Sequence, residues 1–155
     1  MDFTEVALVL DALDAAGVPR WVAGGWGVAA LAGRQTREHR DLDLLVEASS
    51  LSACLAVLTD LGYARETDWL PARVEYGAPG RGWVDVHPVV FDTEGNGRQA
   101  GLAGTHFDYP AECFVVGSVH GRSVACLSVD RQLEAHVGYD PRPQDLLDIA
   151  TLQGL

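Results

Sequence analysis

Two apolar segments of this chain carry acidic side chains at positions where a buried strand would need apolar ones. The first reads DLDLLV from residue 41, so its apolar side chains fall on one face of a strand and Asp41 and Asp43 on the other. Two steps of about 3.3 Å place the two aspartates roughly 6.6 Å apart at Cα. A solvent-facing edge strand could carry the same acids harmlessly, so this pair alone leaves both interpretations open.

The second segment, residues 83–91, reads WVDVHPVVF and places one carboxylate, Asp85, in a strongly apolar run. If the two strands pair, Asp41, Asp43 and Asp85 meet on one surface. Three such carboxylates are the ligand set for two magnesium ions about 3.5 to 4 Å apart in phosphoryl-type displacement, and oxygen ligands suit magnesium better than zinc. His87 shares the face of Asp85 and could contact an acceptor, or could simply pack at the strand end.

A glycine pair, Gly24-Gly25, joins a short β-prone run at residues 18–23 to a small-residue helix at residues 26–31. The absence of side chains lets phosphate oxygens approach backbone N–H groups at the positive end of a helix. Tight packing of the helix on the strand would explain the glycines equally well if the aspartates were absent. Together with the aspartates, the glycine pair predicts a bound polyphosphate.

Cations are scarce, since 22 acidic and 11 basic residues give a formal net charge of -11. That charge repels phosphate backbones and argues against a nucleic-acid partner. Four potentially cationic groups nevertheless gather just before the first aspartate, at Arg34, Arg37, His39 and Arg40. They could neutralise a triphosphate, with Arg37 and His39 as the first candidates, or they could pair with nearby acids.

The remaining sequence predicts a single domain, residues 1–155, with a helical C-terminal portion over about 128–155. Further helices are expected at residues 3–16 and 51–61, strands at 73–76, 114–119 and 122–127, and a turn at 92–97. Three cysteines without a paired spacing indicate reduced thiols. No segment reaches the roughly 18 apolar residues of a membrane span. We therefore expect a cytoplasmic protein that binds neither a membrane nor a nucleic acid.

The motifs at Gly24-Gly25-Trp26, residues 33–43 and residues 84–88 resemble those of the lincosamide and aminoglycoside nucleotidyltransferases, in the DNA polymerase β-like superfamily. The segment at residues 136–141 and the acidic helix through Asp148 extend the resemblance over most of the chain. It implies an α+β nucleotidyltransferase fold, in which a small, mixed, twisted sheet is flanked by helices and carries the active site on its exposed face.

The resemblance also implies the chemistry. The glycine turn and the paired aspartates would bind the magnesium nucleotide, and Asp85 would complete the site and act as general base. The expected reaction transfers a nucleoside monophosphate to a hydroxyl of a lincosamide- or aminoglycoside-type antibiotic and releases pyrophosphate. The expected donor is ATP, which gives AMP, or another nucleoside triphosphate, which gives its own monophosphate. Trp83 and Tyr139 lie beside matched motifs and are candidate acceptor contacts.

Two other functions stay open from the residues alone. A phosphoesterase could use a mixed site of histidines and carboxylates with manganese or zinc, built from His39, Asp41, Asp43, Asp85 and His87. A non-catalytic nucleotide- or partner-binding domain of the same fold is the other. The sequence does not identify the acceptor, because fold and chemistry do not fix the substrate, and it leaves the oligomeric state open, a homodimer included.

Overall fold

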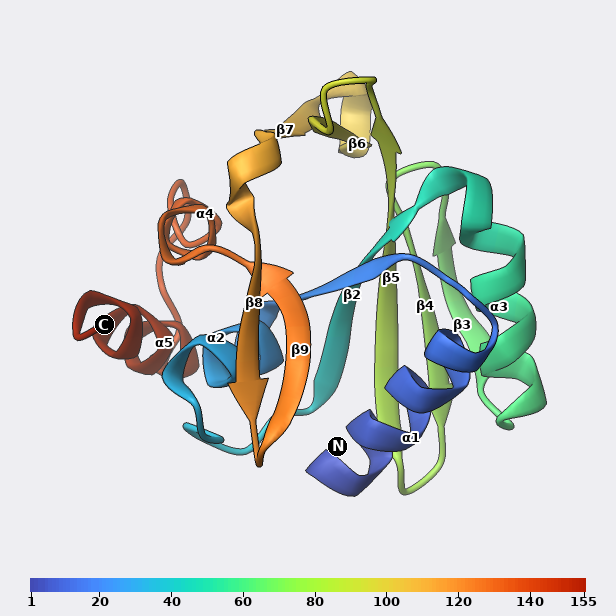
Figure 1. Cartoon of the computed structure of the whole chain (residues 1–155), viewed down its shortest axis with the longest axis horizontal. Helices are drawn as coiled ribbons and strands as arrows, with labels where there is room; N and C mark the ends of the chain where they lie inside the picture. Colours follow the sequence, from blue (N-terminus) through green and yellow to red (C-terminus); the bar gives the residue numbers. More distant parts are fainter.

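Nine strands form one mixed sheet with helices packed around it in the computed structural model, which describes residues 1–155 (Figure 1). The helices are α1 (Phe3–Ala15), α2 (Gly24–Ala32), α3 (Leu51–Asp60), α4 (Val129–Glu134) and α5 (Pro143–Gln153). The strands are β1 (Arg20–Ala23), β2 (Asp41–Glu47), β3 (Ala64–Trp69), β4 (Arg73–Ala78), β5 (Gly82–Phe91), β6 (Gly97–Ala100), β7 (His106–Tyr109), β8 (Phe114–Val119) and β9 (Arg122–Leu127). Short 3-10 turns occur at Ala48–Ser50, Leu102–Gly104 and Ala111–Cys113.

The strand order is β3-β4-β5-β2-β1-β9-β8, and β6 and β7 extend from β5 at one end of the sheet. The central strands β2 and β5 run parallel, with Asp43 directly opposite Asp85. Strand β1 is antiparallel to β2 and parallel to β9, so the sheet is mixed. The predicted α+β class, with a mixed sheet flanked by helices, is confirmed.

Helices α1 and α3 lie together against one face of the central strands, on the right of Figure 1. Helix α1 buries Val6, Val9, Leu10 and Leu13 at helical spacing, and these side chains share one core with the apolar face of β2 and β5. Each fully buried side chain of this kind contributes about 1.5 to 3 kcal/mol. Because successive side chains of a strand point to opposite faces, Asp41, Asp43 and Asp85 lie on the face of β2 and β5 that α1 and α3 do not cover.

Helices α2, α4 and α5 group together on the left of Figure 1, where α2 contacts both C-terminal helices and buries Trp26, Ala29 and Ala30 in the same core as α1. Ser128 caps α4 by accepting a hydrogen bond from the backbone N–H of Arg131, as a serine at this position predicts. Helix α5 begins with Pro143 and is capped through Asp145, whose carboxylate accepts from the backbone N–H of Arg142. The two predicted closing helices are confirmed.

The sequence does not predict the hairpin of β6 and β7, and it places only a turn before residue 97. Each strand has only four residues: GRQA lacks apolar alternation, and HFDY alternates over too short a run to mark a strand on its own. Tertiary pairing to β5 forms them instead.

None of the helices combines the length and the apolar character needed to cross a bilayer.

Candidate active site

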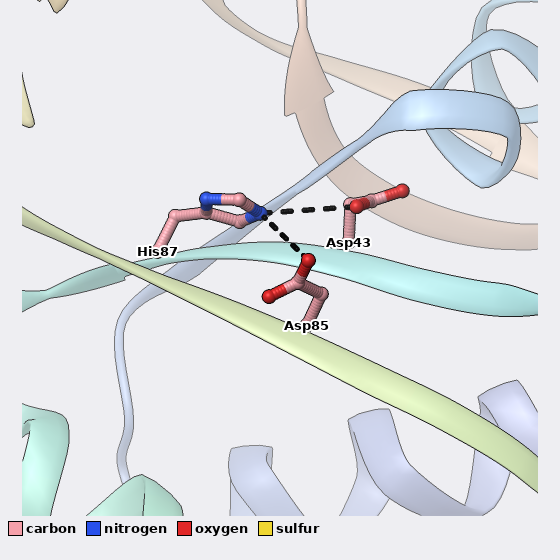
Figure 2. A group of neighbouring side chains, drawn as sticks. All are labelled: Asp43, Asp85 and His87. Carbon is pink, nitrogen blue, oxygen red and sulfur yellow. Dashed lines mark ion pairs between the residues drawn. The ribbon is translucent and has the colours of Figure 1, made fainter. Parts of the chain in front are cut away.

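Asp43, Asp85 and His87 converge on the exposed face of the central strands (Figure 2). Strand β2 contributes the first and β5 the other two, and one ligand atom from each lies within 4.8 Å of the others. The Nε2 atom of His87 is 3.8 Å from Asp43 Oδ1 and 3.8 Å from Asp85 Oδ2. The parallel register creates this cluster, because it sets the two aspartates side by side.

Asp85 is the most buried member of the cluster, with 5% of its surface exposed. Its Oδ2 pairs with the guanidinium of Arg73 on β4, whereas its buried Oδ1 has no hydrogen-bond partner. Burial raises the pKa of Asp85 above its usual range and Asp43 adds to the rise, while His87 and Arg73 act in the opposite direction. A carboxylate with a raised pKa is a stronger proton acceptor, which suits a general base.

Asp41 lies on the same face of β2 but outside that tight cluster. Its carboxylate accepts two hydrogen bonds from Arg40, at 3.0 and 2.8 Å. Arg40 also bonds Glu75 of β4 at 3.2 Å and lies over the ring of Trp83, 5.0 Å from its centroid. The carboxylate of Asp41 therefore has a cationic partner within the chain.

The glycine pair lies where β1 meets α2, directly beside the aspartates. Gly24 has a φ of 55°, in the left-handed region, and a methyl group at its Cα would overlap Oδ2 of Asp43. At Gly25 a methyl group would overlap the ring of His39 and the guanidinium of Arg37. Both positions accept only glycine without displacing a neighbouring side chain.

Arg37 and His39 lie behind this turn. Arg37 forms a bidentate pair with Asp148 of α5, at 3.0 and 2.7 Å, and the side chain of Asp148 is 2% exposed. His39 is buried against Trp26, with ring centroids 4.5 Å apart, and neither of its nitrogens has a hydrogen-bond partner. Burial, and then Arg37, lower the pKa of His39 to about 4, so the ring is neutral at neutral pH. A direct contact of these two residues with a triphosphate stays a prediction.

A cavity of about 380 Å³ lies beside the cluster, between the sheet face, α4 and the segment that follows α4. Gly24, Asp43 and His87 line one side, and Tyr139, from the segment between α4 and α5, lines the other. Trp83 is not part of this cavity, and lines a separate depression beside Met1 and Arg40. Of the three candidate acceptor contacts, the structure therefore brings His87 and Tyr139 to the same cavity as Asp43.

The residues present fit a divalent cation of the magnesium type. The donors are carboxylate oxygens on one sheet face, which hard cations prefer, and Asp85 is a buried carboxylate whose Oδ1 has no hydrogen-bond partner within the chain. The adjoining cavity gives a ligand access to Asp43.

Four residues that shape this site were not predicted from the sequence to be site residues: Arg73, Glu75, Gln99 and Asp148. The first two alternate along a segment that the sequence does predict to be a strand, so their common face could have been found from the period of two. Gln99 lies in the unpredicted strand β6 and reaches His87. Asp148 meets Arg37 from a distance of 111 residues along the chain, for which no local signal exists.

Fold and site together are those of a nucleotidyltransferase, and comparison with known proteins gives the family. The sequence model described as aminoglycoside-2''-adenylyltransferase matches residues 5–152, so the chain belongs to that family. A lincosamide resistance protein of Staphylococcus haemolyticus is 34% identical over 97% of this chain and 94% of its own length. A 2''-aminoglycoside nucleotidyltransferase of Escherichia coli is 38% identical over 40% of this chain and 37% of its own.

Solved structures agree with the sequence comparison. The lincosamide antibiotic adenylyltransferase LnuA, crystallised with lincomycin bound, superposes with a TM-score of 0.90 at 33% identity, covering 99% of this chain and 97% of its own. ANT(2'')-Ia in complex with adenylyl-2''-tobramycin superposes with a TM-score of 0.73 at 22% identity, covering 97% and 87%. The predicted nucleotidyltransferase fold is confirmed, and the chain is an enzyme of this class.

Proposed function

We propose that this enzyme transfers AMP from ATP to a hydroxyl of an antibiotic, with magnesium, and releases pyrophosphate. The observation that carries the proposal is the parallel register of β2 and β5, which sets Asp43 against Asp85 beside the Gly24 turn. Carboxylates for a metal and a glycine turn at a helix N-terminus are the parts that a nucleoside triphosphate needs. Membership of an adenylyltransferase family supports the nucleotide assignment.

Asp41, Asp43 and Asp85 would hold two magnesium ions. Asp43 and Asp85 already face each other, whereas Asp41 would exchange its bonds to Arg40 for a metal. The bound ions would neutralise the negative charge that develops on the α-phosphate and on the leaving pyrophosphate.

Gly24 and Gly25 would bind the phosphates through the backbone N–H groups that begin α2. The side chains of Arg37 and His39 occupy the space where a side chain at Gly25 would lie. We therefore assign them first to holding this turn in place. The positive charge of Arg37 also adds to the field that attracts the triphosphate, even while the guanidinium is paired with Asp148.

Asp85 would accept the proton of the acceptor hydroxyl. The freed oxygen attacks the α-phosphorus, the new P–O bond forms, and the bond to pyrophosphate breaks. The raised pKa of Asp85 supports this role, since burial makes the carboxylate a better base. His87 and Tyr139 line the cavity from opposite sides and would contact the acceptor. Trp83, outside the cavity, would reach only an acceptor that extends toward Arg40.

A lincosamide is the acceptor we favour over an aminoglycoside. The lincosamide resistance protein is 34% identical over nearly the whole chain, and LnuA superposes with a TM-score of 0.90 at 33% identity, whereas ANT(2'')-Ia superposes with a TM-score of 0.73 at 22% identity. The net charge of -11 fits a small-molecule acceptor better than a nucleic acid. The three free, buried thiols fit the reducing cytoplasm, where ATP is available.

Hydrolysis by a mixed histidine and carboxylate site is less favoured. His39, one of its five expected ligands, is buried against Trp26 behind the glycine turn and does not join the cluster. A phosphoesterase would use manganese or zinc and would hydrolyse its substrate without a triphosphate.

Incubation of the protein with magnesium, labelled ATP and a panel of lincosamides and aminoglycosides tests the proposal. We expect a lincosamide to gain the mass of one AMP, with pyrophosphate released in equal amount. Asp85→Asn should reduce kcat by about 100-fold or more, since general bases contribute that much. Absence of transfer to every acceptor, together with absence of magnesium-dependent ATP binding, would refute the assignment. Full activity of Asp85→Asn would refute the base alone.

A further inference from the structure

A chain of buried hydrogen bonds reaches the active-site face from the unpredicted hairpin of β6 and β7. The side-chain nitrogen Nε2 of Gln99 lies 3.1 Å from Nδ1 of His87 and 3.3 Å from the backbone carbonyl of Ala72. The hydroxyl of Tyr109 donates to Oε1 of Gln99 at 2.7 Å. Gln99 and Tyr109 are each 7% exposed, so protein atoms rather than water determine their partners.

The backbone carbonyl of Ala72 fixes which way the Gln99 amide points. A carbonyl can only accept, so the amide group that faces it must be the NH2 and not the oxygen. The opposite orientation would set two acceptors against each other in a buried place, which is costly. The NH2 has two hydrogens, and the second is directed at Nδ1 of His87.

An imidazole nitrogen that accepts a hydrogen bond cannot carry a proton, so the proton of the neutral ring must be on the other nitrogen. That other nitrogen, Nε2, is the atom that faces Asp43 and Asp85 at 3.8 Å. We propose that Gln99, itself oriented by Ala72 and Tyr109, is a positioning residue that fixes His87 as a hydrogen-bond donor to the active site through Nε2–H.

This assignment separates His87 from the metal ligands, although it lies within 4.8 Å of two carboxylates. A protonated nitrogen has no free lone pair for a metal, so Asp43 and Asp85 remain as the ligands of the cluster. The Nε2–H group instead faces the carboxylate oxygens of Asp43 and Asp85. It would also face an acceptor oxygen bound in the adjoining cavity. Only this last step, donation to the acceptor, rests on the proposed function.

Nitrogen-15 NMR of the protein labelled in its five histidines reads the tautomer directly. At about pH 8 we expect His87 to show a protonated Nε2 and an unprotonated Nδ1. The spectrum of His87→Gln identifies the signals that belong to His87. Added magnesium should leave Nε2 protonated. A proton on Nδ1 in the unmodified protein, or loss of the Nε2 proton when magnesium binds, would overturn the proposal.

Substitutions at Gln99 test the cause. Gln99→Glu replaces the donor with an acceptor, and should move the His87 proton to Nδ1. Gln99→Met removes the donor and should give a mixture of tautomers. Tyr109→Phe removes only the outer hydrogen bond and should preserve the tautomer. If Gln99→Glu folds with the proton still on Nε2, Gln99 does not set the tautomer.

Transfer assays add a functional measurement. His87→Gln places an amide donor near the position of Nε2, so it should retain more activity than His87→Phe, which has none. Gln99→Met should lower kcat/KM by about tenfold, the cost of one hydrogen bond, without changing the affinity for ATP. Equal activity of His87→Gln and His87→Phe would show that His87 does not act as a hydrogen-bond donor in the reaction. Because the tautomer is measured without substrate, an inactive protein refutes the proposed function and leaves this test intact.

Discussion

Gly24 lies against Asp43, so close that a methyl group at its Cα would overlap the carboxylate oxygen Oδ2. The glycine belongs to the junction of β1 and α2, and the aspartate to β2, which pairs with β1. The proposed phosphate-binding turn and the proposed metal ligand are therefore one packed unit. A side chain at residue 24 would displace Asp43.

Gly24→Ala tests this unit. Alanine at a φ of 55° costs about 1 to 2 kcal/mol of stability, and its methyl group pushes Asp43 out of place. We expect kcat/KM to fall by about 100-fold, as small misplacements of catalytic groups do. Gly33→Ala is the control, because Gly33 has a φ of 73° and nothing within 4 Å of an added methyl group. It should show a similar loss of stability and nearly full activity. Equal activities of the two variants would contradict the coupling.

The pair of Arg37 and Asp148 joins α5 to the loop before β2, and its removal should destabilise the fold. Asp148→Asn leaves a guanidinium that is largely buried without its charge partner, which costs about 3 kcal/mol. Urea unfolding measures the change. Asp108→Asn is the matched control, since its pair with Arg98 is 58% and 65% exposed and should leave the unfolding midpoint unaltered. A midpoint for Asp148→Asn that equals the control value would show that the pair carries no stability.

The buried ring of His39 makes stability depend on pH. The folded protein holds the pKa of His39 at about 4, against about 6.5 when the chain is unfolded. As pH falls through this interval the unfolded chain takes up a proton that the folded chain does not, so stability is lost on acidification. His39→Phe removes this contribution. We expect the urea midpoint of the unmodified protein to fall more steeply than that of His39→Phe between about pH 6.5 and about pH 4. Parallel pH profiles would contradict the burial of a neutral ring.

Arg73 should set the pH at which the proposed base becomes ionised. Arg73 and His87 lower the pKa of Asp85 against the effect of burial, so Arg73→Gln should raise that pKa. Transfer requires the ionised carboxylate, and the acidic limb of the kcat/KM profile should therefore move to higher pH. Arg65→Gln is the control, because Arg65 pairs with the exposed Asp68 on β3. An unmoved acidic limb in Arg73→Gln would mean that another group controls it.

The central pair of strands could be predicted from the sequence because their residues carry a local signal. Alternation placed Asp41 and Asp43 on one face of β2, and the apolar run around Asp85 predicted β5. The glycine pair, the caps at Ser128 and Pro143 and the two C-terminal helices also follow from local chemistry. These features depend on neighbours within a few residues.

The composition of the site did not follow from the sequence in the same way. Asp41 stays a predicted metal ligand, but in the structure its carboxylate pairs with Arg40, and His87 is the residue that lies within 4.8 Å of Asp43 and Asp85. Arg37 was expected to face a triphosphate, yet Asp148 holds it from α5. Each outcome depends on a partner from another element, whose position no local pattern specifies.

By itself the sequence predicted the class of chemistry: two acidic strands and a glycine turn together indicate a metal and a polyphosphate. Tertiary structure decided how each group is used. The parallel register of β2 and β5 set Asp43 against Asp85, and the pairing of β6 with β5 brought Gln99 to His87. The physical reason is that side-chain type and period are local properties. Burial, charge pairing and tautomer depend on atoms that meet only when distant segments pack together.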